Sequence, residues 1–203
     1  MADRIARGIS VIFHPILIPL YILLILLNQN LFFALLIPVK SKFILTGIVF
    51  FSTIALPMLS VWFFCRLKLV SSVAMNTREE RIYPLLIIAI FYYMTYYLLK
   101  SFPISLLFSY YMLGSAFLVI LALIISFWMK ISLHMIGIGG FLGIFLGLSL
   151  KLSLDLSILI LPVILLSGII GSARLNENSH KPSEIYTGFF AGVIVMLCLF
   201  LMI

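Results

Sequence analysis

The residues best suited to chemistry lie in a polar segment, 171–188, which interrupts two apolar runs. Arg174, His180 and Glu184 occur there, with five and then three residues between them. Arginine offers paired donors to phosphate, histidine can act as a nucleophile or carry a proton near neutral pH, and a carboxylate can orient an imidazole. This set suits phosphoryl transfer, which needs positive charge around the transferred group and an in-line nucleophile.

Two shorter polar segments carry further candidates. Segment 130–134, KISLH, contains Ser132 and His134, and segment 76–84, NTREERIYP, contains Arg78 and Arg81. The chain has only 13 basic and 6 acidic residues, yet four of them stand at positions 78–81. Plain alternatives stay open: a solvated loop for segments 76–84 and 171–188, and a histidine bonded at a helix start for His134.

Composition identifies the elements that must hold these residues. With 65% hydrophobic and 9% charged residues, and a mean hydropathy of +1.32, the chain carries too much apolar surface for a soluble domain. We expect an all-α, polytopic membrane helix bundle of six or seven transmembrane helices, forming one domain over residues 1–203. Apolar runs predict spans at 9–27, 43–65, 84–99, 104–129, 133–150, 156–170 and 185–203.

Local signals refine three of these elements. Pro15 and Pro19 should kink or delay the first span, where His14 would lie in the bundle or at its interface. Gly139, Gly143 and Gly147 recur every fourth residue, which predicts close approach of another helix. The two cysteines, Cys65 and Cys198, lack metal-ligand spacing, and we expect neither a metal nor a cofactor.

Parity predicts that the three polar segments share one side of the membrane. Two spans separate 76–84 from 130–134, and two more separate 130–134 from 171–188, so the chain returns to the same side each time. The positive-inside rule leaves that side open, because four of the basic residues there would be occupied by phosphate. The net charge of +7 fits anionic headgroups or a phosphorylated substrate better than nucleic acid.

The three segments together resemble the type 2 phosphatidic acid phosphatase superfamily. Ala173-Arg174, five residues, His180, three residues and Glu184 is similar to its third motif, Ser-Arg, five residues, His, three residues, Asp. The stretch 131–134, ISLH, looks like its second motif, Pro-Ser-Gly-His. Arg81 and Pro84 lie where its first motif, a Lys followed after six residues by Arg-Pro, would fall. This chain differs in having Glu184 for Asp, Ala173 for Ser, and Ala74 seven positions before Arg81.

The resemblance implies an integral membrane lipid phosphatase that needs no metal and works through a phosphohistidine intermediate. His180 would be the nucleophile, Glu184 would orient it, and His134 would protonate the leaving group. Arg174, Arg81, Arg78 and Ser132 would bind the substrate phosphate. The expected partners are a phosphorylated lipid substrate and membrane lipids, in a bacterial inner membrane, with a homo-oligomer left open.

Two other functions remain open from the sequence. The altered first and second motifs favour a catalytically inactive relative that binds or translocates a phosphorylated lipid. A haem held by His134 and His180 would leave Arg174, Glu184 and the charges at 78–81 without a role.

Overall fold

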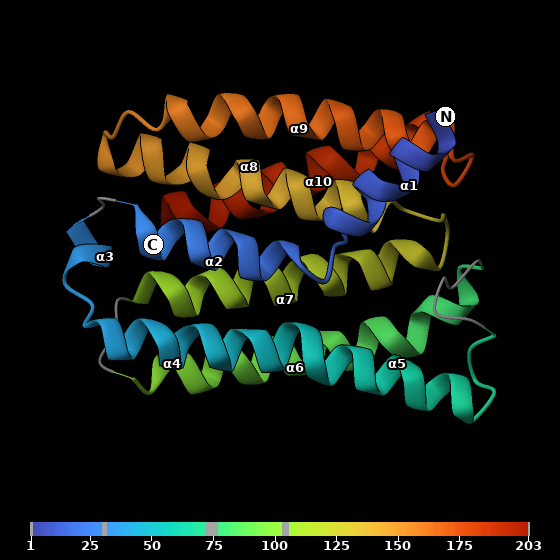
Figure 1. The fold of residues 1–203 in the computed structure, drawn as a ribbon, viewed down its shortest axis with the longest axis horizontal. Coiled ribbons are helices and arrows are strands. Elements are labelled where there is room, and N and C mark those ends of the chain that lie inside the picture. The colour runs from blue at the N-terminus through green and yellow to red at the C-terminus, as the bar shows by residue number, and fades with distance from the viewer. Residues whose placement is uncertain (1, 30–31, 72–76, 103–105, 203) are drawn as a thin grey trace. The chain divides into compact units, whose positions relative to one another are not determined.

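The computed structural model describes residues 2–29, 32–71, 77–102 and 106–202, and within these ranges the chain is helical and contains no strand (Figure 1). The start of the first polar segment at Asn76 and the expected start of the fourth span at Ile104 lie outside the described residues. The all-α architecture predicted from the apolar runs is therefore confirmed.

The helices follow one another in the order α1 (Ala2–Ile12), α2 (Ile18–Asn28), α3 (Phe32–Leu35), α4 (Val39–Phe50), a π-helical turn (Phe51–Ala55), α5 (Leu56–Arg66), a 3-10 turn (Glu79–Arg81), α6 (Ile82–Lys100), α7 (Leu106–Ser126), α8 (Leu133–Leu152), α9 (Ser157–Asn176) and α10 (Pro182–Met202). Among the described residues, six helical segments are long and apolar enough to cross a membrane. They are Val39–Arg66, Glu79–Lys100, Leu106–Ser126, Leu133–Leu152, Ser157–Asn176 and Pro182–Met202. The element order keeps two such segments between successive polar segments, as the parity argument requires.

The expected first span, 9–27, is wrong as a continuous helix. It divides into α1 and α2, because Pro15 has no N–H to continue the helical ladder and disfavours helical geometry at His14. A short turn, with Leu17 N–H donating to the His14 carbonyl at 2.8 Å, joins the two helices. The helix α1 is amphipathic, with Arg4 and Arg7 exposed and Ala6 and Ser10 buried.

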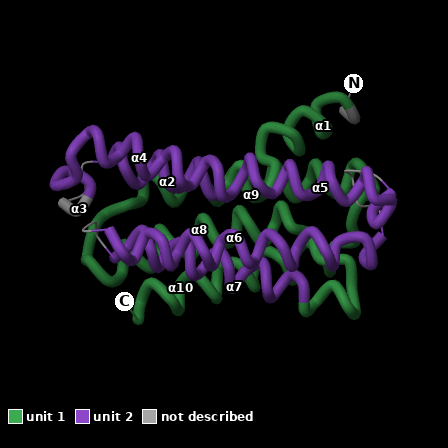
Figure 2. Tube along the Cα trace, turned by 90° about the horizontal axis from the view of Figure 1, so that it is seen from below, with its two compact units in different colours: residues 1–18, 124–203 green, residues 19–123 purple. Residues whose placement is uncertain are grey.

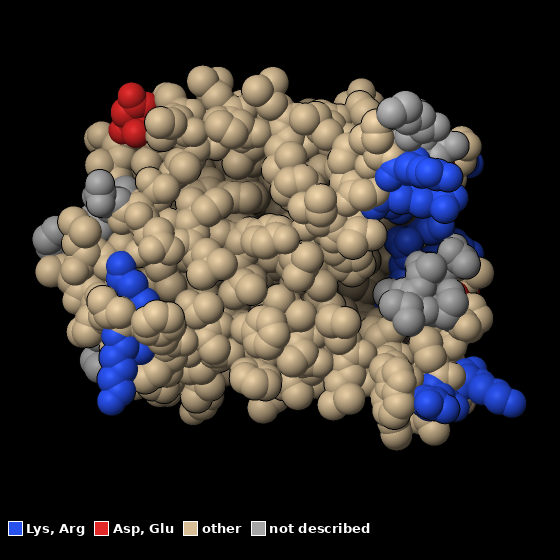
Figure 3. Space-filling view, viewed as in Figure 1, with Lys and Arg blue, Asp and Glu red and all other residues tan. Residues whose placement is uncertain are grey.

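The chain forms two compact units, which Figure 2 colours separately. Unit 1 comprises residues 1–18 and 124–203, and unit 2 comprises residues 19–123. On the face drawn in Figure 3, lysine and arginine lie at helix ends within each unit, while the middle stretches of the spans show neither. This distribution suits helices whose central turns meet hydrocarbon.

Unit 1 is held together by the close packing of α8 against α10. A Cβ on Gly139 would collide with the Phe189 carbonyl oxygen, and one on Gly143 would lie 2.5 Å from the Val193 carbonyl oxygen. Gly192 approaches α8 in the same way from the α10 side, where a Cβ would meet the Ile136 carbonyl oxygen. The close helix approach predicted from the glycine spacing is confirmed. This pairing fixes the ends of α8 and α10, where the candidate residues lie.

Candidate functional site

The local sequence determines the turn between α9 and α10. Helix α9 ends at Asn176, and Asn178 adopts a left-handed conformation with φ of 50°, which asparagine tolerates better than most residues. Pro182 begins α10, because its missing N–H is not needed in the first helical turn. Glu184 accepts a hydrogen bond from the Lys181 N–H at 3.2 Å and so caps the helix start. The helix therefore starts three residues before the expected position 185.

His180 is a buried imidazole with a defined proton position. Its Nδ1 lies 2.8 Å from Glu184 Oε2 and 3.1 Å from the Lys130 carbonyl oxygen. Because both neighbours are acceptors, Nδ1 carries the proton and donates it. Nε2 is then the nitrogen with the basic lone pair, and the carboxylate holds the ring in that tautomer.

The polar segments 130–134 and 171–188 meet in unit 1. Besides the contact of His180 with the Lys130 carbonyl, the Ser132 N–H donates to the Glu184 carbonyl oxygen at 3.3 Å. Gly188 permits this approach, since a Cβ there would lie 2.9 Å from the Ser132 carbonyl oxygen. The close packing of α8 and α10 therefore brings the start of one helix against the start of the other.

Arg174 is paired with the carboxylate of Glu177, which is not among the residues predicted from the sequence. Its Nη1 donates to Glu177 Oε2 at 2.5 Å and to Ser10 Oγ at 3.2 Å, while the Ser10 hydroxyl donates to Glu177 Oε1 at 3.0 Å. The arginine and glutamate side chains are only 13% and 14% exposed. The spacing of three residues at the end of α9 was the available signal for Glu177.

His134 contacts the N-terminal helix α1. Its Nε2 lies 3.0 Å from the Ser10 carbonyl oxygen, so Nε2 is the donor and carries a proton. The His14 ring stands edge-to-face to it, with ring centroids 5.6 Å apart. Desolvation, helped by the positive charge of Arg174, lowers the pKa of His14 from its ordinary value of 6.5. No sequence signal pointed to Ser10, which binds both His134 and Arg174.

Two enclosed donors in unit 1 lack a hydrogen-bond partner among the described residues. They are the Ser132 hydroxyl and Arg174 Nε. An unsatisfied buried donor costs about 1–3 kcal/mol, so such groups usually mark a place for water or a ligand. Both residues can donate to an oxyanion.

These contacts define a buried polar cluster in unit 1, made of Ser10, Ser132, His134, Arg174, Glu177, His180 and Glu184. The remaining candidates, Arg78 and Arg81, belong to unit 2, where Arg81 is buried and its backbone N–H donates to the Arg78 carbonyl oxygen at 3.2 Å. Arg78 Nε donates to Glu79 Oε1 at 2.8 Å, and Glu80 accepts from the Ser71 N–H at 2.9 Å. The described residues contain no group of three or more His, Cys, Asp and Glu side chains suited to a metal ion.

The fold and composition define an integral membrane protein, a polytopic all-α bundle with six helical segments of spanning length in its described part. Comparison with family models finds no match, and comparisons with curated proteins and with solved structures find none either.

Proposed function

We propose that this protein is a membrane lipid phosphatase that hydrolyses a phosphomonoester or diphosphate of a lipid through a phosphohistidine intermediate. The observation that carries the proposal is the His180–Glu184 pair, with Nδ1 protonated and directed at the carboxylate. Arg174 and Ser132, in the same unit, supply buried donors without protein partners among the described residues. The proposed location is a bacterial inner membrane.

The reaction assigns one role to each side chain of the cluster. The Nε2 lone pair of His180 attacks phosphorus, the bond from phosphorus to the lipid oxygen breaks, and His134, protonated on both ring nitrogens for this step, gives that oxygen the proton of Nδ1. Water then gives a proton to His134 and attacks the phosphohistidine, which releases inorganic phosphate and restores both histidines. Arg174 and Ser132 would donate to the phosphate oxygens, and Glu184 would stabilise the positive ring formed during the first step. The role of phosphate ligands that the sequence suggests for Arg78 and Arg81 stays a prediction.

One contact favours the alternative of a catalytically inactive relative that binds or translocates a phosphorylated lipid. Glu177 and Ser10 occupy Nη1 of Arg174, so a phosphate must compete with a carboxylate already in place. A binding protein can tolerate this competition, whereas an enzyme needs the cation available in each turnover. In the phosphatase, Glu177 would release Arg174 when substrate arrives.

Phosphate release by purified protein in lipid nanodiscs tests the proposal, with a panel of lipid monophosphates and diphosphates. The informative variant is His180→Asn, because the asparagine amide can replace the Nδ1 donor toward Glu184 while the nucleophilic nitrogen is lost. We expect wild-type protein to release phosphate and form an acid-labile phosphoprotein, and His180→Asn to do neither at an unchanged unfolding temperature. Transbilayer movement of a phosphorylated lipid without phosphate release would instead establish the transporter alternative.

A further inference from the structure

We propose that the groove between α1 and α9 binds an acyl chain of the phosphorylated lipid whose phosphate is held at Arg174. The groove lies wholly within unit 1 and has a volume of about 460 Å³, within the range of small-molecule sites. The ligand assignment rests on the proposed function only in placing the lipid phosphate at Arg174; it does not require hydrolysis.

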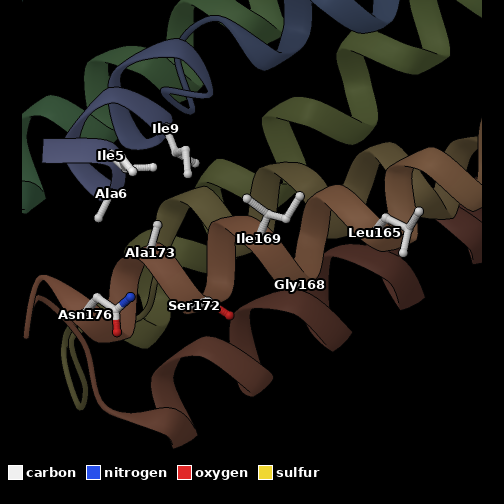
Figure 4. A pocket seen from close by; sticks show the side chains of 9 residues that line it. All are labelled: Ile5, Ala6, Ile9, Leu165, Gly168, Ile169, Ser172, Ala173 and Asn176. Carbon is white, nitrogen blue, oxygen red and sulfur yellow. The ribbon is translucent and has the colours of Figure 1, made fainter. Parts of the chain in front are cut away.

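The walls of the groove are hydrocarbon over most of their length. Figure 4 shows Ile5 and Ile9 of α1 facing the part of α9 that carries Ile169 and Ala173, and Gly168 lies on the same helix. Polar lining residues, Ser172 and Asn176, belong to the last turns of α9. A groove with this distribution suits an aliphatic chain attached to a polar headgroup.

The position of the groove along α9 favours a lipid tail over water or a polar metabolite. Its lining extends from Leu165 to Asn176, which are eleven helical steps apart on a helix of spanning length, or about 16.5 Å at 1.5 Å per residue. The Leu165 end therefore lies toward the bilayer interior, where water finds no hydrogen-bond partners on hydrocarbon walls. The Asn176 end adjoins the polar segment 171–188.

Two residues that line the groove are next in sequence to residues of the buried polar cluster. Ala173 lines the groove and is followed by Arg174, while Ile9 lines it and is followed by Ser10. Arg174 Nη1 and Ser10 Oγ are 3.2 Å apart, so the two helices are joined at this point. A phosphate at Arg174 would thus have its lipid chain beside α1, whose exposed Arg4 and Arg7 favour anionic headgroups.

Gly168 provides a substitution that fills the groove without disturbing protein packing. A Cβ built at Gly168 has no heavy atom within 4 Å, so the side chain of Gly168→Leu can enter the open space. Gly47 in α4 also has no heavy atom within 4 Å of a Cβ, and it lies in unit 2, away from the groove lining. Gly47→Leu is therefore the matched control.

The experiment uses full-length protein in nanodiscs and a phosphatidate that carries a photoactivatable group near the end of one acyl chain. We expect saturable labelling of residues 165–173 in wild-type protein and in Gly47→Leu, reduced about tenfold in Gly168→Leu because leucine displaces part of the chain. A photoactivatable diacylglycerol, which lacks phosphate, should label these residues much less. Labelling that is unchanged by Gly168→Leu, equal for diacylglycerol, or spread evenly over all apolar helices would overturn the proposal.

Phosphate release measured on the same samples separates this inference from the proposed function. Phosphate-dependent labelling of the groove without hydrolysis would support the acyl site and refute the phosphatase. Hydrolysis of long-chain phosphatidate at the wild-type rate by Gly168→Leu would refute the acyl site and leave the phosphatase intact. A selective loss of activity on long-chain substrate, with activity on a short-chain analogue retained, would support both.

Discussion

The substitution Glu184→Gln probes the contact on which the proposed chemistry depends most. Glu184 Oε2 accepts from His180 Nδ1 at 2.8 Å and from the Lys181 N–H at 3.2 Å. A glutamine can keep an oxygen at this place, so the helix start and the ring orientation can survive. What is lost is the negative charge.

The size of the effect follows from that geometry. Replacing a charged acceptor by a neutral one weakens a hydrogen bond by about 1 kcal/mol, which corresponds to about fivefold in rate. The His180 ring becomes positive on phosphorylation, and it then loses more stabilisation when the carboxylate is absent. Opposite charges about 4 Å apart attract by about 4 kcal/mol at an effective dielectric constant of 20. We therefore expect the rate of the chemical step to fall about 10²- to 10³-fold, while lipid binding changes little.

Single-turnover hydrolysis of labelled phosphatidate, with enzyme in excess over substrate, measures this step directly. Glu184→Asp is the matched variant, since it keeps the charge but shortens the side chain, and it should retain more activity than Glu184→Gln. If Glu184→Gln turns over at the wild-type rate with an unchanged unfolding temperature, the carboxylate is only a helix cap and its catalytic role is refuted.

Three further substitutions test other parts of the structure. Glu177→Gln removes the charge that neutralises Arg174, so vanadate should bind about five- to tenfold more tightly; weaker binding would mean that Glu177 serves to orient the arginine. Gly139→Ala should lower the free energy of unfolding by about 1–3 kcal/mol, because its Cβ meets the α10 backbone, whereas Gly47→Ala, with open space around its Cβ, should not be destabilising. The pKa of His14 is lowered in the folded protein, so the folded protein binds a proton at His14 less well than the unfolded chain does. Stability is therefore lost as pH falls below about 6.5. His14→Gln should flatten the decline in unfolding temperature between about pH 6.5 and pH 5, and an equally steep decline would exclude His14 as its source.

Segments of the chain acting alone determine much of the architecture. Long apolar runs predict helices that cross a membrane, because a helix satisfies every backbone polar group within itself. The proline at Pro15 divides the first run, and the glycines at every fourth position of α8 prepare a flat surface for α10. Each of these effects depends on neighbouring residues, so each can be found without knowing the fold.

The His180–Glu184 contact is also largely local. His180 stands two residues before α10 and Glu184 lies in its first turn, so the start of the helix at Pro182 brings the two side chains together. The Arg174–Glu177 pair is local as well, with a spacing of three. The phosphate-binding role predicted for Arg174 gave no reason to expect the counter-ion Glu177 beside it.

Only the tertiary structure decides what surrounds these local pairs. Ser10 binds His134 from 124 positions away and Arg174 from 164 positions away, through a backbone carbonyl and a hydroxyl that carry no distinguishing pattern. The Lys130 carbonyl selects the His180 tautomer across 50 positions, and any residue type at 130 could supply that oxygen. The groove beside α9 likewise arises from the way α1 lies on it. The sequence of an apolar helix face does not show where the neighbouring helix leaves a gap.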